Sequence, residues 1–426
     1  MIRIAGRPVL RRTAGNIILA SAALLIVAGL GRTTGSGPVA PVPPASQVRA
    51  LISGEAGGYE QALRRLDLKI QSDAADAAAR PGEWLFEEAL ARALLARARL
   101  SGNYEDYALA QAAVDRAFRA APPGTGPHLT AAILAFSLHR LDESERMLDR
   151  IDGYAVPPAG GDLAEVLGMR GDIALYRGDG KAASRFYRRA EEAAPGSADF
   201  RMAIRLSHQG LPAPADAALA RVAARMRTAP RRARAQIALQ RGIVQLDNGR
   251  HAAALERFRE ADRLFPGYWL IEEHIAETLS LTGRDAEAEA ILKDVTGRTG
   301  HPEYMDALAN LARKRGDTAE ASRWSALARQ GWERRVQLFP EAAYGHGIDH
   351  CLAARDAACA LRLAMLNHRA RPFGEAKLKL ARALALAGRI DEARTLVNAA
   401  SAMEWRAGDI REVRRELAWA TGRTGR

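Results

Sequence analysis

Two histidines one helical turn apart are the residues of this sequence best placed to do chemistry. His346 and His350 lie four positions apart, so on a helix they share one face, with Asp349 beside them and Cys351 next along. Two imidazoles in this arrangement could hold a transition metal, although a third ligand has to come from elsewhere in the chain. The alternative is that both histidines line a groove or an interface between helices. We expect no metal or other cofactor, and keep a metal-dependent enzyme at His346 and His350 as an alternative function.

The two cysteines offer a second kind of chemistry. Cys351 and Cys359 are the only cysteines among the 426 residues, too few for a disulfide scaffold and too few by themselves for a zinc site. We expect Cys351 near the end of one helix and Cys359 near the start of the next, facing each other across a tight hairpin. In an oxidising compartment they would form a disulfide, and otherwise they are two buried thiols.

No catalytic motif accompanies these residues. The sequence lacks the patterns GxxxxGK[ST], GxGxxG, GxSxG and HExxH. Adjacent acidic residues such as Glu272 and Glu273 point in different directions on a helix, so they cannot act together as acid and base. We therefore expect a protein that is not an enzyme.

A cluster of arginines forms the third candidate site. No acidic residue occurs between Asp216 and Asp247. The arginines in this stretch are Arg221, Arg225, Arg227, Arg231, Arg232, Arg234 and Arg241. They could dock an acidic partner, an anionic lipid surface or a polyanion. Because the chain has 56 arginines and only six lysines, a merely solvated face is the alternative. The cluster lacks the interleaved aromatic residues that stack bases, so we expect no nucleic acid partner.

The start of the chain resembles an export segment. A basic stretch, residues 1–16, precedes an apolar run at 17–31, and a Gly/Pro-rich linker follows at 32–47. Residues 1–50 supply six of the twelve net positive charges and contain no Asp or Glu. This order is typical of a signal anchor or a signal peptide, with the basic side retained in the cytoplasm. We expect a single span in a bacterial inner membrane with the rest of the chain in the periplasm, or secretion to the periplasm after cleavage.

The elements that position these residues are repeated helical hairpins. Two units of about 34 residues lie end to end between Ala235 and Pro302. The first unit has its small, turn, aromatic and breaker positions at Gly242, Gly249, Ala254, Phe258, Ala261 and Pro266. The second repeats them at Ala276, Gly283, Ala288, Leu292, Val295 and Gly300. Small residues let two helices approach closely, and the large residue fills the space between them. No run of alternating β-branched residues predicts a strand.

The order and spacing of these positions resemble the tetratricopeptide repeat family. The resemblance implies an all-α fold, a right-handed α-solenoid of stacked helix hairpins over residues 48–426. We expect about nine units and a polar C-terminal capping helix at about Asp409–Thr421, with the apolar N-terminal helix in front. One second helix should run on to Phe339, about two turns longer than the family pattern.

In proteins of this family the first helices of successive repeats line a concave groove that binds extended peptides. The groove residues that the resemblance implies here are Gln236, Glu273, Glu277, Asp306, Asn310, Arg313, Asp349 and Arg382. Asn310 matches one position of the family's carboxylate clamp, but Asp306 stands where a lysine is expected, so polar recognition of another kind is implied. We expect a non-catalytic scaffold or adaptor for proteins of the bacterial cell envelope. The alternative is a sensory or regulatory subunit that signals through its membrane anchor.

Overall fold

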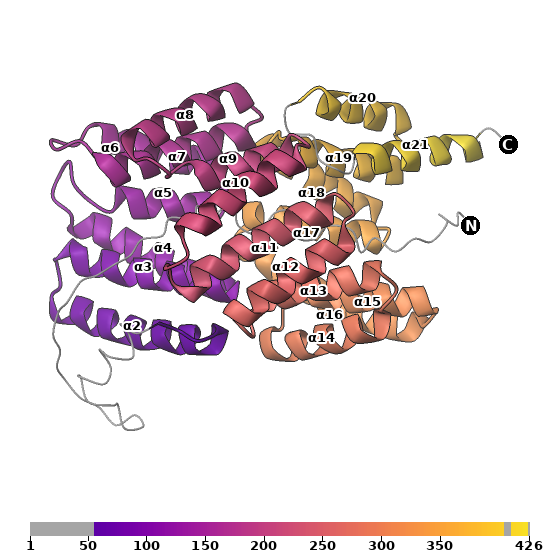
Figure 1. Cartoon of the computed structure of the whole chain (residues 1–426), viewed down its shortest axis with the longest axis horizontal. Helices are drawn as coiled ribbons and strands as arrows, with labels where there is room; N and C mark the ends of the chain where they lie inside the picture. Colours follow the sequence, from indigo (N-terminus) through magenta and orange to yellow (C-terminus); the bar gives the residue numbers. More distant parts are fainter. Residues whose placement is uncertain (1–54, 404–409, 425–426) are drawn as a thin grey trace.

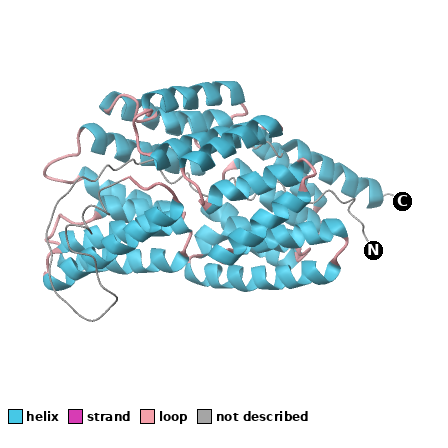
Figure 2. Ribbon diagram, turned by 60° about the horizontal axis from the view of Figure 1, so that its bottom comes forward, coloured by secondary structure: helices cyan, strands magenta, loops and turns pink. Residues whose placement is uncertain are grey.

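The chain is helical throughout the part that its structure describes. The structure is a computed structural model, and it describes residues 55–403 and 410–424 (Figure 1). Helices and turns account for these ranges and no strand occurs in them (Figure 2). The expected basic segment, apolar helix and linker at 1–16, 17–31 and 32–47 lie outside the described residues. Among the helices that are described, none is both long enough and apolar enough to cross a bilayer.

Nine antiparallel hairpins follow one another along the described chain, as the repeat predicts. A single helix, α2 (Tyr59–Ala79), precedes them, and α21 (Ile410–Thr424) follows the last one. The hairpins are α3 (Trp84–Ser101) with α4 (Tyr104–Ala120), α5 (His128–Ser137) with α6 (Leu141–Asp152), α7 (Gly160–Tyr176) with α8 (Gly180–Ala193), α9 (Asp199–His208) with α10 (Pro212–Arg225), α11 (Arg231–Asp247) with α12 (His251–Leu264), α13 (Trp269–Leu281) with α14 (Asp285–Thr299), α15 (Pro302–Arg315) with α16 (Thr318–Leu338), α17 (Pro340–Ala353) with α18 (Ala357–Ala370), and α19 (Gly374–Leu386) with α20 (Ile390–Ser401).

Within a hairpin the two helices touch where the sequence has its small residue and its aromatic. A Cβ atom added to Gly242 on α11 would lie 2.3 Å from Cε1 of Phe258 on α12. Gly171 on α7 has the same relation, also at 2.3 Å, to Tyr187 on α8. Interhelical contact at this distance excludes any side chain, so glycine fixes the spacing of the pair.

One second helix is longer than the others, as expected. α16 has 21 residues and ends at Leu338, whereas α12 has 14. The extra turns carry Trp332, which is buried and donates its indole N–H to Oδ2 of Asp306 at 2.8 Å. The additional length therefore extends this unit's packing inward instead of leaving a projecting helix.

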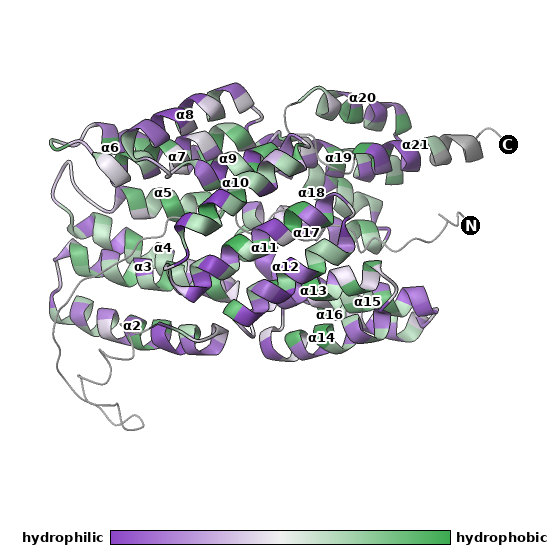
Figure 3. Ribbon diagram, in the orientation of Figure 1, coloured by the Kyte–Doolittle hydropathy of each residue, from purple (hydrophilic) through white to green (hydrophobic). Residues whose placement is uncertain are grey.

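The first and second helices of a hairpin differ in how deeply they are buried. Ten of the thirteen residues of α13 are buried, against three of the fifteen of α14. A helix that is buried on nearly every side must be covered on a second face as well as by its partner. The second helices keep polar outer faces, and Figure 3 shows hydrophilic residues over much of α8 and α12.

The second cover comes from the chain itself, because the early hairpins pack against the late ones. The backbone N–H of Tyr59 on α2 donates to the carbonyl of Pro266 at 3.0 Å. The indole N–H of Trp269 on α13 donates to the carbonyl of Leu100 on α3 at 2.8 Å. We call the contact between α2–α8 and the segment from α12 to α19 the closure interface.

Aromatic residues continue the closure interface along its length. Tyr104 at the start of α4 lies 6.4 Å from Phe339, and Tyr176 at the end of α7 lies 5.2 Å from Phe373, measured between ring centroids. Phe339 and Phe373 belong to the same hydrophobic cluster as the cores of α3 to α8. The solenoid is thus closed on itself, and its inner helices are sandwiched between two parts of the array.

Candidate functional site

A polar cavity lies inside the closure interface. Its volume is about 80 Å³, and its walls come from α3, α4 and α5 on one side and from α13, α15, α16 and α17 on the other. The polar residues that line it are Arg99, Tyr104, Tyr107, Ser137, His139, Trp269, His301, Glu303, Arg335 and His346. Polar groups are costly to bury unless they are satisfied, so the lining residues that lack a hydrogen-bond partner are the informative ones.

One ion pair accounts for two of the charges in the cavity. Nη1 of Arg335 on α16 lies 2.5 Å from Oε1 of Glu303 on α15, and both residues are buried. Burial alone would raise the pKa of Glu303, but Arg335 and His301 outweigh it and lower that pKa to about 2. Glu303 is therefore ionised and Arg335 is neutralised by it.

Arg99 is the cation of the cavity that has no such partner. Its Nε donates to Oγ of Ser137 at 3.2 Å, while Nη2 is shielded from solvent and has no hydrogen-bond partner. Within the described residues no carboxylate forms an ion pair with Arg99. Burial lowers the pKa of Arg99. With Arg335 and Glu303 cancelling, the cavity lining carries an uncompensated positive charge.

Three histidines of the lining are held neutral. Burial lowers the pKa of His301 to about 4, and it lowers the pKa of His346 and, further still, that of His139. Both ring nitrogens of His346 and Nδ1 of His139 are shielded and without a hydrogen-bond partner. A neutral imidazole carries one N–H and one acceptor nitrogen, so these rings bring unused donors to the cavity.

His139 occupies a backbone position that glycine fills in most of the hairpins. The turns of seven hairpins have glycine with a positive φ, namely Gly102, Gly178, Gly210, Gly249, Gly283, Gly316 and Gly388. His139, like Arg355 in the turn after α17, takes the same left-handed conformation, with φ 61°, which is uncommon for a residue with a side chain. The backbone is thus strained at a residue whose ring lines the cavity.

The two histidines of the metal hypothesis have separate environments. His346 stacks on Trp332, with ring centroids 5.8 Å apart, and lines the cavity. His350 is buried, and its Nδ1 lies 2.7 Å from Oδ1 of Asp306. In the described part of the chain no group of three or more His, Cys, Asp or Glu side chains is placed to hold a metal ion. Both histidines lie between helices, His346 at the cavity and His350 against Asp306 of α15.

Three of the residues implied for a peptide groove lie in the interior. Glu273, Glu277 and Asp306 are buried, and Asp306 is bonded to Trp332 and His350. Their helices, α13 and α15, are the inner helices that the early hairpins cover. These carboxylates are therefore occupied by contacts inside the protein.

Two other implied groove residues connect the last two hairpins to each other and to α21. Asp349 on α17 lies 2.5 Å from Nζ of Lys379 on α19, and Arg382 on α19 lies 3.1 Å from Oε2 of Glu416 on α21. These links run between successive first helices and end on the capping helix. Gln236 on α11 is partly exposed. Asn310 and Arg313 on α15 bond to each other, and Arg313 also reaches Oγ of Ser325 at 2.7 Å.

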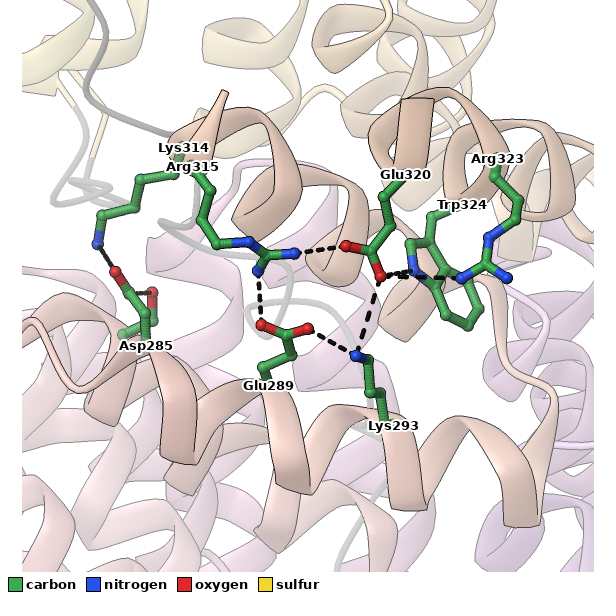
Figure 4. A network of polar contacts seen from close by, with 9 residues as sticks. Asp285, Glu289, Lys293, Lys314, Arg315, Glu320, Arg323 and Trp324 are labelled. Carbon is green, nitrogen blue, oxygen red and sulfur yellow. Dashed lines mark hydrogen bonds and ion pairs between the residues drawn. The ribbon is translucent and has the colours of Figure 1, made fainter. Parts of the chain in front are cut away.

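The outer surface of the same units carries a more exposed ion network. Arg315 on α15 pairs with Glu289 on α14 at 2.5 Å and with Glu320 on α16 (Figure 4). Lys293 joins Glu289 at 2.7 Å. Because these side chains are partly solvated, their contribution to stability is small, and we assign them no site.

The cysteines lie as the hairpin predicts. Cys351 is in the last turn of α17 and Cys359 near the start of α18, with Cα atoms 5.8 Å apart, and the structure joins them by a disulfide. Oxidation in solution stays a prediction. Counting thiols on unreduced, unfolded protein tests it, and two free thiols would contradict it.

The arginine cluster borders a surface groove of about 330 Å³ between α10, α11 and α12. Its floor is apolar, formed by residues such as Ala223, Ile237 and Leu264. Arg227 and Arg234 line it, and within the described residues neither forms an ion pair.

Three other arginines of the cluster are committed to internal contacts. Arg241 pairs with Asp216 at 2.8 Å, and this hydrogen bond raises the pKa of Arg241. Arg231 donates to two backbone carbonyls on α12. Arg225 pairs with Asp199. Of the three cluster arginines that line the groove, Arg227 and Arg234 are the two for which the described residues supply no ion pair.

The sequence pointed to His346 but not to the rest of the cavity. Arg99, His301 and Arg335 sit in ordinary repeat positions and carry no local motif. His139 is the exception among the lining residues, because it stands where the repeat has a turn glycine. That substitution is the signal from which the site could have been found.

Comparison with known proteins identifies the family that the central hairpins resemble. The tetratricopeptide repeat profile matches residues 245–311. No curated protein has a significant match to the sequence. Similar solved structures include a Rap protein complexed with competence and sporulation factor, at 15% identity over 81% of this chain and 99% of that one, with a TM-score of 0.46. Yeast Tom70 is similar at 12% identity over 86% of this chain and 88% of that one, with a TM-score of 0.43.

A thermophilic tetratricopeptide repeat protein of Thermus thermophilus is similar at 20% identity. The similarity covers 44% of this chain and 98% of that one, with a TM-score of 0.35. The family match falls on α13 and α14 and their neighbours, where the repeat is most regular, and the same hairpin recurs nine times along the described chain. Residues 245–311 thus match the tetratricopeptide repeat family.

Proposed function

We propose that this protein is a non-catalytic interaction scaffold whose groove between α10, α11 and α12 binds an acidic segment of a partner protein. The observation that carries the proposal is the pair Arg227 and Arg234, two arginines without carboxylate partners beside an apolar floor. An extended segment with alternating acidic and small apolar residues complements both features.

The concave face is the less favourable docking surface in the closed arrangement. The early hairpins cover the inner helices, and Glu273, Glu277 and Asp306 are buried. An extended peptide would have to displace the closure interface to reach them. The groove between α10 and α12 lies on the outer surface and needs no such rearrangement, so less free energy is lost on binding.

Charge reversal tests the groove. Fluorescence anisotropy with a labelled peptide of alternating Glu and Ala should show saturable binding to the full chain, weakened at least about tenfold by Arg227→Glu with Arg234→Glu. The matched control reverses Arg188 and Arg329, two exposed arginines outside the groove. Equal weakening in both double variants would mean that the peptide responds only to overall charge, and would contradict the proposal.

The proposed place of action is the bacterial cell envelope, with residues 17–31 as a signal anchor or a cleaved signal peptide. The support is the sequence pattern of a basic segment, an apolar run and a Gly/Pro-rich linker. Fusing residues 1–50 to an enzyme that is active only outside the cytoplasm should give activity. Placing two lysines within the apolar run should abolish export and with it the activity of the fusion. Activity that persists in this variant would contradict the assignment.

A further inference from the structure

The cavity in the closure interface has the charge and donors of an anion site. Arg99 brings a cation with an unused N–H, while Arg335 is already neutralised by Glu303. A partly buried cation whose N–H is shielded from solvent is costly without a counter-charge, and proteins offset such a cost with a counter-ion or with hydrogen bonds to its charged form. Here the described residues supply neither beyond the contact to Ser137.

The donors around Arg99 come from both sides of the closure interface. His139 closes the α5 turn in a strained conformation, and His346 belongs to α17. His346 has only 7% of its surface exposed, and neither of its ring nitrogens has a hydrogen-bond partner. Unsatisfied groups facing one cavity from two helices and a turn indicate a ligand that accepts several hydrogen bonds.

We propose that this cavity binds a small oxyanion, a carboxylate or a phosphate group, held by Arg99 and by ring N–H groups of His139 and His346. Oxyanions accept several charge-assisted hydrogen bonds at once, and a guanidinium matches their geometry. The volume of about 80 Å³ exceeds the roughly 10–15 Å³ that one water needs, so the cavity has room for one small group but not for a peptide chain. Water could meet the hydrogen bonds but would leave the positive charge uncompensated.

A bound oxyanion would also stabilise the closed form. Arg99 lies on α3 and His346 on α17, so a ligand that contacts both bridges the early and late hairpins. Any ligand that binds only the folded, closed chain raises its stability with concentration. Binding is therefore visible as a rise in the unfolding temperature.

The experiment is a thermal unfolding titration of the full chain with sodium acetate and with sodium phosphate, against sodium chloride at equal ionic strength. We expect a saturable rise in the unfolding temperature with at least one oxyanion, and the two arms separate carboxylate from phosphate. Arg99→Gln should weaken this binding at least about tenfold, because a hydrogen bond to a charged group contributes about 1.5–3 kcal/mol. The matched control is Arg92→Gln, on the same helix but outside the cavity lining, which should leave it unchanged.

A second variant covers the case in which Arg99→Gln does not fold. His346→Phe keeps a ring to stack on Trp332 and removes both ring nitrogens, and it too should weaken binding. The absence of a saturable effect with both oxyanions would overturn the proposal. Binding that is equally strong in every folded cavity variant would also overturn it, because the anion would then sit elsewhere.

Discussion

Two arginines in the interior of this solenoid, Arg201 buried and Arg99 partly buried, differ in what surrounds the cation. Arg201 on α9 pairs with Asp172 at 2.9 Å and Glu165 at 3.0 Å, both on α7, and Tyr187 also donates to Asp172. Arg99, in the cavity, has one hydroxyl partner and no carboxylate. The first arrangement joins two neighbouring hairpins and is complete. The second joins distant hairpins and lacks an anion, which is how a structural ion cluster differs from a candidate binding site.

Removing the cation of the complete cluster should have the largest effect. Arg201→Met leaves Asp172 and Glu165 without a buried counter-charge, which should cost about 3–5 kcal/mol of unfolding free energy. Denaturant unfolding measures this. Adding Asp172→Asn should recover part of the loss, since one stranded charge is removed as well. A single-variant loss below about 1 kcal/mol would mean that solvent reaches the cluster.

Acid should weaken the closure interface next. Burial lowers the pKa of His301 to about 4 from an ordinary 6.5, so the folded state favours the neutral ring. The unfolded chain binds a proton first, and stability is lost as the pH falls from 6.5 to 4, by about 3 kcal/mol. Glu303 adds to this loss below pH 4.5, because its folded pKa is also lowered.

Unfolding experiments at pH 7 and pH 4 isolate the histidine. His301→Gln should show a smaller loss of stability between these pH values than the wild type. His251→Gln, at the start of α12 and outside the cavity lining, serves as control. If His301→Gln loses as much stability as the control, the closure interface does not depend on a neutral His301.

Adding a methyl group at Gly171 tests how closely α7 packs against α8, beside the Arg201 cluster. Gly171→Ala places a Cβ 2.3 Å from the ring of Tyr187, whose hydroxyl serves the Arg201 cluster. Overpacking of this kind should cost about 1–3 kcal/mol in denaturant unfolding. Gly161→Ala on the same helix has no atom within 4 Å and should be neutral or stabilising. Equal effects at both positions would contradict the packing argument.

The smallest effect on the free energy of unfolding is expected for the substitution of Arg99. In chloride buffer Arg99→Gln strands no carboxylate. It loses the hydrogen bond to Ser137 but also removes a cation without a counter-charge, so its net cost should be only about 0.5–1.5 kcal/mol. Denaturant unfolding beside Arg201→Met gives the direct contrast. A loss as large as that of Arg201→Met would show that Arg99 is a structural cation.

Local features of the fold could be predicted because each depends on residues close in the sequence. The position of Gly242 against Phe258, the length of α16 and the hairpin between Cys351 and Cys359 all follow from spacing within one unit. The apolar segment at 17–31 lies outside the described residues and stays a prediction.

The candidate site could not be predicted in the same way. Arg99 and His346 meet only because small rotations between successive hairpins add up until the array closes. The accumulated rotation between hairpins cannot be read from the spacing of residues within one repeat. The expectation of an open concave groove assumed exposed inner helices, whereas Glu273 and Asp306 are buried beneath the early hairpins.

By itself the sequence determined the unit: which residues form a helix, where it turns, and which small and aromatic side chains bring two helices together. Only the tertiary structure decided what the inner helices face. The reason is physical, since a hairpin is fixed by contacts a few residues apart, while closure depends on the accumulated geometry of every hairpin between α3 and α17.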